Sequence, residues 1–280
     1  MSKITKRKIA VFDIDGTIFR NSLLVELHWK MVKAGIIPKA AIKKLDRRYW
    51  EWVQRKGAYD DYLSEVIKSF DDFSVGQKVS IIKKLASKVV KVQSNIVYRY
   101  TRDLIAKLRQ THILVAISGS PKEIVEEFAH AWKFDHFVGT EHEIMNGKYT
   151  AGPKFVASQH KREVLLNLVK QHGFNLSGSV GVGDTESDAE MLDLVAYPIC
   201  FNPTSGLYKI AKRKKWPVAV ERKDVIYRLQ RVLCHPRARR TRQEPRIQNF
   251  DGMDCPVTPD NDRGEAIFPG SPTSEKSRTS

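Results

Sequence analysis

The chain lacks the features of several protein classes. Its three cysteines among 280 residues are far apart and include no Cys-x-x-Cys pair, so we expect neither a disulfide framework nor a zinc cluster, and a reducing compartment. The longest uncharged apolar run, Ile113 to Ile117, is much shorter than the roughly 20 residues that a membrane-spanning helix needs. The basic start resembles a signal peptide, but Asp13 interrupts its apolar run. We therefore expect a cytoplasmic protein.

Acidic residues are also scarce relative to basic ones. The chain has 48 Lys and Arg against 32 Asp and Glu, a net charge of +16, with 41% hydrophobic residues. This composition excludes disorder throughout the chain and is compatible with acidic partners. Residues 205–246 alone carry +11, whereas residues 247–280 carry −3. Most of the positive surplus therefore lies late in the chain.

Short apolar runs alternate with helical patterns. The runs predict buried strands at 8–13, 112–118, 179–184 and 197–202, with a further candidate at 217–220. Helix-spaced apolar residues predict helices at 121–132, with Ser120 as N-cap and Pro121 as first residue, and at 161–172, ended by Gly173. This alternation predicts an α/β fold with a parallel sheet flanked by helices.

Residues 21–94 break the alternation, because they contain only helix-spaced apolar residues. They predict a helical insertion after the first strand. The core would then comprise residues 1–20 and 95–234, with a helix at 95–110 and a hairpin at 141–150 around Asn146-Gly147. From residue 235 onward Pro, Arg, Ser, Asp and Gly dominate, so we expect a disordered tail at 235–280 that is first basic and then acidic.

Two carboxylates follow the first strand, in the segment Asp13-Ile-Asp15-Gly-Thr17. Side chains two residues apart in an extended segment share a direction, so both carboxylates can face one small volume. Such a pair suits a nucleophile or metal ligand beside a general acid. The competing interpretation is an acidic turn after a strand.

Polar residues also follow the other predicted strands. Ser118-Gly119-Ser120 places a hydroxyl and free N–H groups at a helix start, which suits a phosphate or is simply a helix cap. Lys161 opens the next helix, where a lone lysine is by default solvated. Asp184 and Asp188 follow the third strand, one helical turn apart. Carboxylate oxygens converging there with Asp13 suit Mg²⁺.

In this order, each at the carboxyl end of a strand, these segments resemble the motifs of the haloacid dehalogenase (HAD) superfamily of phosphohydrolases, in its phosphoserine-phosphatase-like branch. The resemblance covers about residues 8–220. It implies a Rossmannoid α/β core and a helical cap that closes over the active site. The residues at 20–22, Arg-Asn-Ser, differ from the Glu with which phosphoserine phosphatases grip an ammonium group, and Ser187 stands in place of their Asn, which disfavours L-phosphoserine.

The resemblance also implies the reacting groups. Asp13 would be the nucleophile that forms an aspartyl-phosphate. Asp15 would be the general acid for the leaving group and the base for the hydrolytic water. Asp13, the backbone carbonyl of Asp15, and Asp184 would hold Mg²⁺.

The remaining motif residues would bind phosphate or support the site. By the same resemblance, Ser118, Gly119 and Lys161 would bind the phosphoryl group. Thr17 would supply turn geometry, and Asp188 would orient Lys161 or a metal-bound water.

The expected partner is a small phosphorylated substrate, either a phospholipid-type or a small-metabolite phosphate. Residues 30–56 carry nine basic and two acidic residues with interleaved aromatic residues, which suits peripheral contact with an anionic membrane. The competing interpretation is that the aromatic stripe packs within the cap. A phosphotransferase, or a sugar or amino-alcohol phosphatase, would use the same core. Nucleic-acid binding is less favoured, because no binding module surrounds the basic clusters at 212–215 and 237–242.

Overall fold

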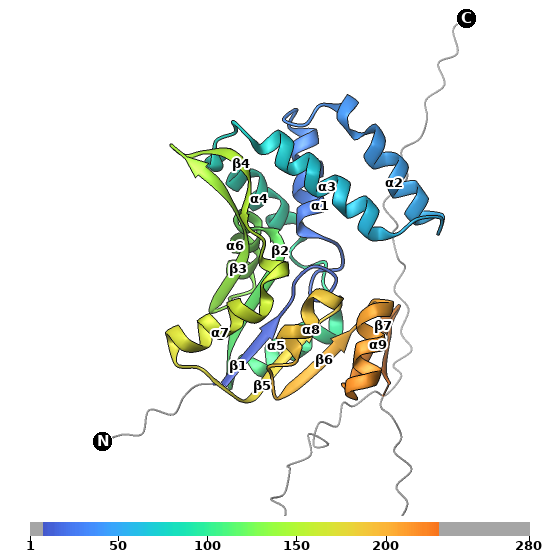
Figure 1. Ribbon diagram of the computed structural model, residues 1–280, viewed down its shortest axis with the longest axis vertical. Helices are drawn as coiled ribbons and strands as arrows, with labels where there is room; N and C mark the ends of the chain where they lie inside the picture. The colour runs from blue at the N-terminus through green and yellow to red at the C-terminus, as the bar shows by residue number, and fades with distance from the viewer. Residues whose placement is uncertain (1–7, 230–280) are drawn as a thin grey trace, which may run out of the picture. The chain divides into compact units, whose positions relative to one another are not determined.

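The computed structural model describes residues 8–229, which form a sheet of eight strands with helices on both faces (Figure 1). The strand order is β4-β3-β2-β1-β5-β6-β7-β8. Neighbouring strands from β3 to β7 are parallel, and β4 and β8 pair antiparallel at the two edges. The predicted α/β fold class is confirmed.

The strands are β1 (Lys8–Phe12), β2 (His112–Pro121), β3 (His136–Met145), β4 (Lys148–Phe155), β5 (Asn175–Gly183), β6 (Tyr197–Phe201), β7 (Val218–Arg222) and β8 (Val225–Leu229). The α-helices are α1 (Leu23–Lys33), α2 (Lys43–Val53), α3 (Tyr59–Ser74), α4 (Val79–Gln93), α5 (Arg99–Leu108), α6 (Lys122–Ala131), α7 (Lys161–His172), α8 (Ala189–Leu192) and α9 (Ser205–Lys214). Three short 3-10 helices are η1 (Lys39–Ile42), η2 (Ala157–Gln159) and η3 (Glu186–Asp188).

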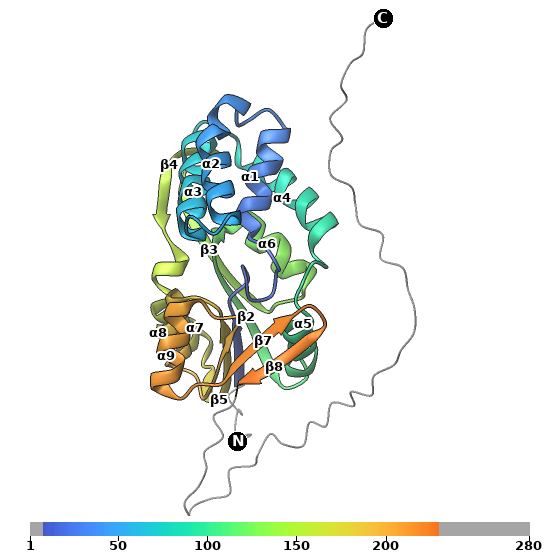
Figure 2. The same cartoon turned by 90° about the vertical axis from the view of Figure 1, so that its right-hand side faces the viewer.

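The sheet separates two apolar clusters, because side chains alternate along each strand. Ala10 and Phe12 of β1 pack with α5, α6 and the inserted helices. Ile9 and Val11 face the opposite side and pack with α7, α8 and α9. Figure 2 shows α7, α8 and α9 on one side of the sheet and α5 on the other. The side chains of these four residues of β1 are fully buried, so this strand holds its carboxyl end in a fixed position.

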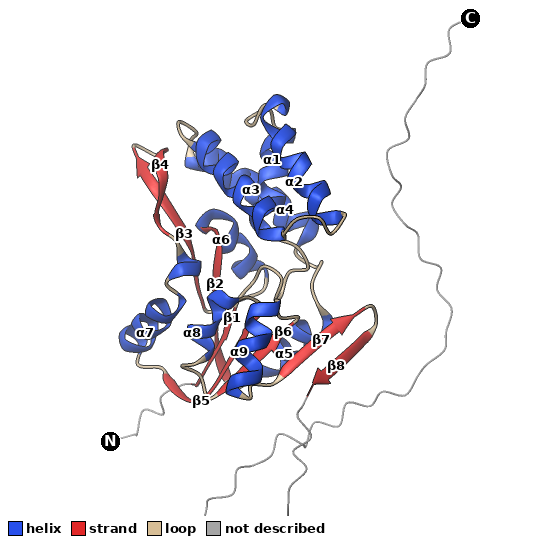
Figure 3. Ribbon diagram, turned by 45° about the vertical axis from the view of Figure 1, so that its right-hand side comes forward, coloured by secondary structure: helices blue, strands red, loops and turns tan. Residues whose placement is uncertain are grey.

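Helices α1 to α4 lie between β1 and α5 in the sequence and gather beyond the carboxyl end of β1 (Figures 1 and 3). Throughout, "cap" denotes residues 21–94. The predicted limits of core and cap stay a prediction, because the cap and the strands form one compact unit. Within residues 8–229, no helix combines the length and apolarity that a bilayer-spanning segment needs.

The local predictions differ from the structure in a few places. Pro121 occupies the N-cap position of α6 rather than its first turn, and Ser120 does not cap that helix, because β2 continues through both residues. The predicted hairpin turn at 146–147 is present, but β3 starts earlier and also pairs with β2. Strand β8 was not predicted. The expected disordered tail at 235–280 lies outside the described residues.

Candidate active site

The carboxylate of Asp13 lies at the centre of the site, immediately after β1. Its backbone N–H donates to the carbonyl of Val182 on β5, at 2.9 Å. This bond continues the pairing of β1 with β5 for one residue, so the side chain leaves the sheet at a defined point. One carboxylate oxygen, Oδ1, accepts from Lys161 Nζ at 2.6 Å. The other, Oδ2, is buried and has no hydrogen-bond partner among the described residues.

Lys161 begins α7 and reaches between two carboxylates. Its Nζ contacts Asp13 Oδ1 at 2.6 Å and Asp188 Oδ1 at 2.5 Å, and the residue is only 3% exposed. Burial acts to lower the pKa of this ammonium, but the two carboxylates outweigh burial and raise it. Lys161 is therefore a buried cation, and the default interpretation of a solvated lysine does not hold.

Asp188 is fixed by the chain that surrounds it. Its Oδ2 accepts from the backbone N–H groups of Asp184 and Thr185, each at 3.0 Å, within a capping box formed by Thr185 and Asp188. A Cβ at Gly183 would come within 2.4 Å of the Asp188 carboxyl carbon. The predicted neighbourhood of Asp188 and Lys161 is thus present in the structure.

Asp184 packs against the turn that follows Asp13. Its Oδ1 accepts from the Thr17 hydroxyl at 3.1 Å. Gly16 has φ +80°, and a Cβ at this residue would lie 2.2 Å from Asp184 Oδ2. Glycine is therefore needed both for the backbone conformation and for the space that Asp184 occupies.

Asp15 bonds to a different set of groups, which come from the first turn of α1 and from β2. Its Oδ1 accepts from the backbone N–H of Leu23 at 2.5 Å. Its Oδ2 accepts from the hydroxyls of Ser118, at 2.5 Å, and Ser120, at 2.9 Å. The Ser118 hydroxyl predicted to bind phosphate thus contacts Asp15. Gly119 lies between the two serines, and a Cβ there would approach Ser158 to 3.1 Å.

Burial raises the pKa of three aspartates in the site, Asp13, Asp15 and Asp184. For Asp13 the pKa rises to about 7, because burial and the neighbouring carboxylates outweigh Lys161. For Asp15, burial outweighs the hydrogen bonds from Ser118, Leu23 and Ser120. For Asp184, burial acts together with the charges of Asp13 and Asp188. The site therefore has an excess of desolvated negative charge.

This excess fits a divalent cation. Oxygens of Asp13, Asp184 and Asp188 lie within 4.8 Å of one another, and Lys161 pairs with only two of these three carboxylates, those of Asp13 and Asp188. The unpaired, buried Oδ2 of Asp13 is a free ligand atom of the type that Mg²⁺ prefers. Asp188 is part of this cluster, whereas the metal ligands predicted from the resemblance are only Asp13, Asp184 and the backbone carbonyl of Asp15. The predicted ligand set stays a prediction.

The sequence profile of the haloacid dehalogenase-like hydrolases matches residues 10–193, which is more than half of the chain. The chain belongs to this family. It is 26% identical over 216 residues to a probable phosphatase of Mycobacterium tuberculosis, covering 76% of this chain and 75% of that protein. It is 22% identical over 226 residues to a histidinol-phosphatase of Neisseria meningitidis, covering 76% and 98% of the two chains.

Solved structures of similar fold include phosphoserine phosphatase. One, described as a phospho-aspartyl intermediate analogue, superposes with a TM-score of 0.52 at 18% identity, over 79% of this chain and 96% of that one. This likeness shows the fold alone. Together with the family match and the phosphatase relatives, it agrees with the predicted phosphoserine-phosphatase-like branch. The predicted enzyme class, a phosphoric monoester hydrolase, is confirmed.

The cap of this HAD hydrolase carries a cluster of aromatic rings. Trp52 packs on Tyr59 with ring centroids 5.0 Å apart, and both rings contact Tyr62. Tyr49 contacts Trp52 and Tyr62 as well, and the Trp29 indole donates to the Tyr62 hydroxyl at 3.3 Å. Tyr49 and Trp52 of the predicted stripe therefore pack on other rings of the cap, as the competing interpretation expects, while Trp50 is 56% exposed. Contact of residues 30–56 with an anionic membrane stays a prediction.

Tyr59 is a member of this cluster whose hydroxyl is influenced by two of the site aspartates. It begins α3, at the end of the cap where α2 and α3 meet (Figure 3). Burial, followed by the charges of Asp15 and Asp184, raises the pKa of its hydroxyl. Tyr59 is not predictable from the local sequence, because its position depends on how the cap helices pack.

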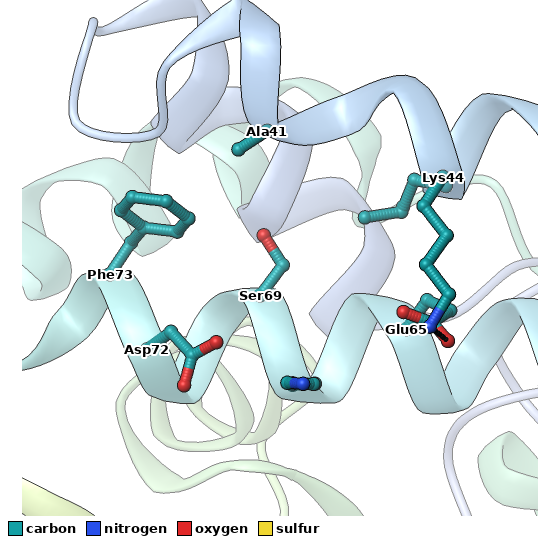
Figure 4. A pocket seen from close by; sticks show the side chains of 8 residues that line it. Ala41, Lys44, Glu65, Ser69, Asp72 and Phe73 are labelled. Atoms are coloured by element: carbon teal, nitrogen blue, oxygen red, sulfur yellow. Dashed lines mark ion pairs between the residues drawn. The ribbon is translucent and has the colours of Figure 1, made fainter.

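A pocket of about 210 Å³ lies elsewhere in the cap, between α2 and α3 (Figure 4). It is lined by Ala41, Lys44, Leu45, Glu65, Lys68, Ser69, Asp72 and Phe73. The Ser69 hydroxyl bonds to His28 Nε2 at 2.9 Å, and Lys44 pairs with Glu65 at 2.5 Å. These groups satisfy one another, and no predicted site residue lines the pocket, so we assign the chemistry to the strand ends instead.

Proposed function

We propose that this protein is a Mg²⁺-dependent phosphatase that hydrolyses a phosphate monoester through an aspartyl-phosphate on Asp13. The observation that carries the proposal is the pair of oxygens on that carboxylate. Oδ1 is neutralised by the buried Lys161 ammonium, and Oδ2 is buried without a partner among the described residues. Such a carboxylate is pre-organised for a phosphoryl group or a metal ion.

In the first half of the reaction, an oxygen of Asp13 forms a bond to phosphorus while the bond from phosphorus to the leaving oxygen breaks. Asp15, protonated before this step, gives its proton to the leaving oxygen, so an alcohol departs. Lys161 lies on the nucleophilic carboxylate and offsets the charge that accumulates on the phosphoryl oxygens. The Ser118 hydroxyl donates to Asp15 in the structure and would turn from that carboxylate to donate to one of these oxygens.

In the second half, the Asp15 carboxylate takes a proton from water as the water oxygen bonds to phosphorus. The bond between Asp13 and phosphorus breaks, and inorganic phosphate and the free carboxylate result. Asp15 then carries the proton that the next cycle needs. The raised pKa of Asp15 favours its use as both acid and base.

The metal would be held by Asp13, Asp184 and the backbone carbonyl of Asp15. When bound, Mg²⁺ supplies the positive charge that offsets the repulsion between a phosphate dianion and a carboxylate nucleophile. Thr17 orients Asp184, and Asp188 orients Lys161, through the hydrogen bonds described above.

The leaving group would be a small-metabolite or phospholipid-type alcohol that contacts the cap. Tyr59 of the cap supports this, because the charges of Asp15 and Asp184 add to burial in raising the pKa of its hydroxyl. Peripheral contact with an anionic membrane stays a separate prediction. Since Tyr49 and Trp52 pack inside the cap, such contact would have to use residues such as Trp50, which is 56% exposed.

A phosphate-release screen tests the proposal. The full-length protein is incubated with phospholipid, amino-alcohol, nucleotide and sugar phosphates, in Mg²⁺ and in EDTA, with Asp13→Asn as the matched control. We expect release from at least one substrate class that requires Mg²⁺ and is absent in the variant. Release that is equal in Asp13→Asn, or that persists in EDTA, contradicts the proposal.

A further inference from the structure

Ser120 occupies a position between the proposed general acid and the cap. Its hydroxyl donates to Asp15 Oδ2 at 2.9 Å and accepts from the backbone N–H of Leu24, in the first turn of α1, at 3.0 Å. Its own backbone N–H donates to Ser118 Oγ at 2.9 Å. Ser120 is only 3% exposed. One residue thus contacts the acid, the phosphate-binding serine and the first helix of the cap.

We propose that Ser120 is a positioning residue that holds the Asp15 carboxyl group toward the leaving oxygen while the substrate engages Ser118. This inference rests on the proposed function. It concerns a residue that acts through Asp15 and does not itself touch the reacting atoms.

The single hydroxyl proton of Ser118 supports a positioning role for Ser120. Ser118 has one proton, which it donates to Asp15 Oδ2 at 2.5 Å. A phosphoryl oxygen that takes this proton removes the bond from Asp15, because one hydroxyl proton cannot serve both acceptors at full strength. Asp15 then keeps the Ser120 hydroxyl on Oδ2 and the Leu23 N–H on Oδ1. The position on Oδ2 that Ser118 leaves is where the transferable proton can lie.

The direction of the Ser120 hydroxyl is also fixed. Because the Leu24 N–H occupies an acceptor position on Oγ, the hydroxyl proton is directed to Asp15 rather than to the α1 backbone. Leu23 and Leu24 together hold the acid and the serine against the first turn of the cap. The orientation of Asp15 is therefore set by the cap as well as by β2. A shift of the cap would change the direction in which Asp15 presents its proton.

Leaving-group dependence separates this role from a merely structural one. Phenyl phosphate and p-nitrophenyl phosphate have nearly the same shape, but only the poorer leaving group, phenolate, needs a well-placed acid. We expect Ser120→Ala to lower kcat/KM for phenyl phosphate by about 10- to 100-fold and for p-nitrophenyl phosphate by less than about threefold. Ser120→Thr, which keeps the hydroxyl, should restore most of the difference.

Two controls make the experiment decisive. Ser22→Ala removes another buried hydroxyl at the start of α1, which accepts from Val25 N–H at 3.5 Å and does not contact Asp15, so the ratio of the two rates should stay as in the wild type. Asp15→Asn should show the same selective loss as Ser120→Ala, and the double variant should lose little more than Asp15→Asn alone. Circular dichroism confirms that each variant is folded.

Results that contradict the role of Ser120 differ from results that contradict the proposed function. Equal losses on both compounds in Ser120→Ala, or a selective loss in Ser22→Ala, overturn the assignment of Ser120. Wild-type protein that releases no phosphate from either compound, or Asp13→Asn with wild-type rates, contradicts the proposed function instead.

Discussion

The carboxyl end of the sheet and the interior of the cap are built from different interactions. At the sheet, Asp13, Lys161 and Asp188 are buried charges, each held by hydrogen bonds shorter than or equal to 3.0 Å. In the cap, Trp52 and Tyr62 are held by ring packing, with few polar bonds. Charged hydrogen bonds fix direction as well as distance, whereas apolar packing fills space with less directional constraint. Hydrogen-bonded charges therefore dominate at the end of the sheet, and ring packing dominates in this part of the cap.

The same difference determines how variants should behave. A change in the core breaks a network of desolvated charges, so we expect it to alter both stability and turnover. A change in the cap alters the shape of the space beside the site, so we expect it to alter substrate preference.

The largest effect is expected for Lys161→Met. Removing the ammonium leaves Asp13 and Asp188 as buried, uncompensated carboxylates, so the free energy of unfolding at pH 8 should fall by about 3–5 kcal/mol. Phosphate release should fall at least about a hundredfold. The control is Lys83→Met, which removes a surface pair with Glu126 at 2.8 Å and should cost less than about 1 kcal/mol. Similar losses of stability in both variants, measured by urea denaturation, would remove the contrast between the two regions.

Gly16→Ala should weaken the metal site specifically. A Cβ at Gly16 would lie 2.2 Å from Asp184 Oδ2, so the carboxylate must move. We expect the Mg²⁺ concentration for half-maximal activity to rise about 10- to 100-fold. Gly147→Ala is the matched control, since Gly147 also has positive φ, +72°, but a Cβ there meets nothing within 4 Å. An unchanged Mg²⁺ requirement in Gly16→Ala would argue against Asp184 as a ligand.

The short motifs at strand ends made the core predictable from sequence. Asp13, Asp184 and Lys161 lie next to buried strands or helix starts, so local patterns place them, and the parallel sheet brings them together. Ser120 was assigned to a helix cap because the distance over which β2 extends is not visible in the local pattern. Its partners, Asp15 and Leu24, are 105 and 96 residues away, and no local signal reports such a contact.

The cap was less predictable for the same physical reason. Its helical character follows from apolar spacing, but which face is buried depends on α1, α2 and α3 together. The spacing of Tyr49 and Trp52 is compatible with a membrane-facing stripe or with packing in the cap, and the contacts of these rings with Tyr59 and Tyr62 come from a different helix.

The stability of the folded protein should depend on pH through Asp13 at the end of the sheet. In the metal-free protein the pKa of Asp13 is raised from 3.8 to about 7, so the folded state holds a proton that the unfolded state has lost. The stabilising contribution is complete below pH 4 and is lost as the pH rises to about 7. In EDTA, the melting temperature of the wild type should therefore fall over this range relative to Asp13→Asn. Parallel curves for the two proteins would contradict the raised pKa.

The smallest effect is expected in the cap. Tyr59→Ala removes a ring that packs on Trp52, so KM should rise by about tenfold for a preferred substrate while kcat changes little. The ratio of kcat/KM between large and small phosphate esters should change with it. Trp50→Ala, at an exposed position on α2, is the control and should leave both constants unchanged. A loss of kcat equal to that of Lys161→Met would show that the cap takes part in the chemistry.

The most direct test is to identify the phosphorylated residue. Protein in rapid turnover with Mg²⁺ is quenched, and the acyl phosphate is reduced with borohydride, which converts a phosphorylated aspartate to homoserine. Asp15→Asn, in which hydrolysis should be slowed, serves to raise the yield. Peptide mass spectrometry should find homoserine at residue 13 in this variant and none in Asp13→Asn. Modification at Ser118 or at another residue, or turnover with no modified Asp13, would contradict the central claim.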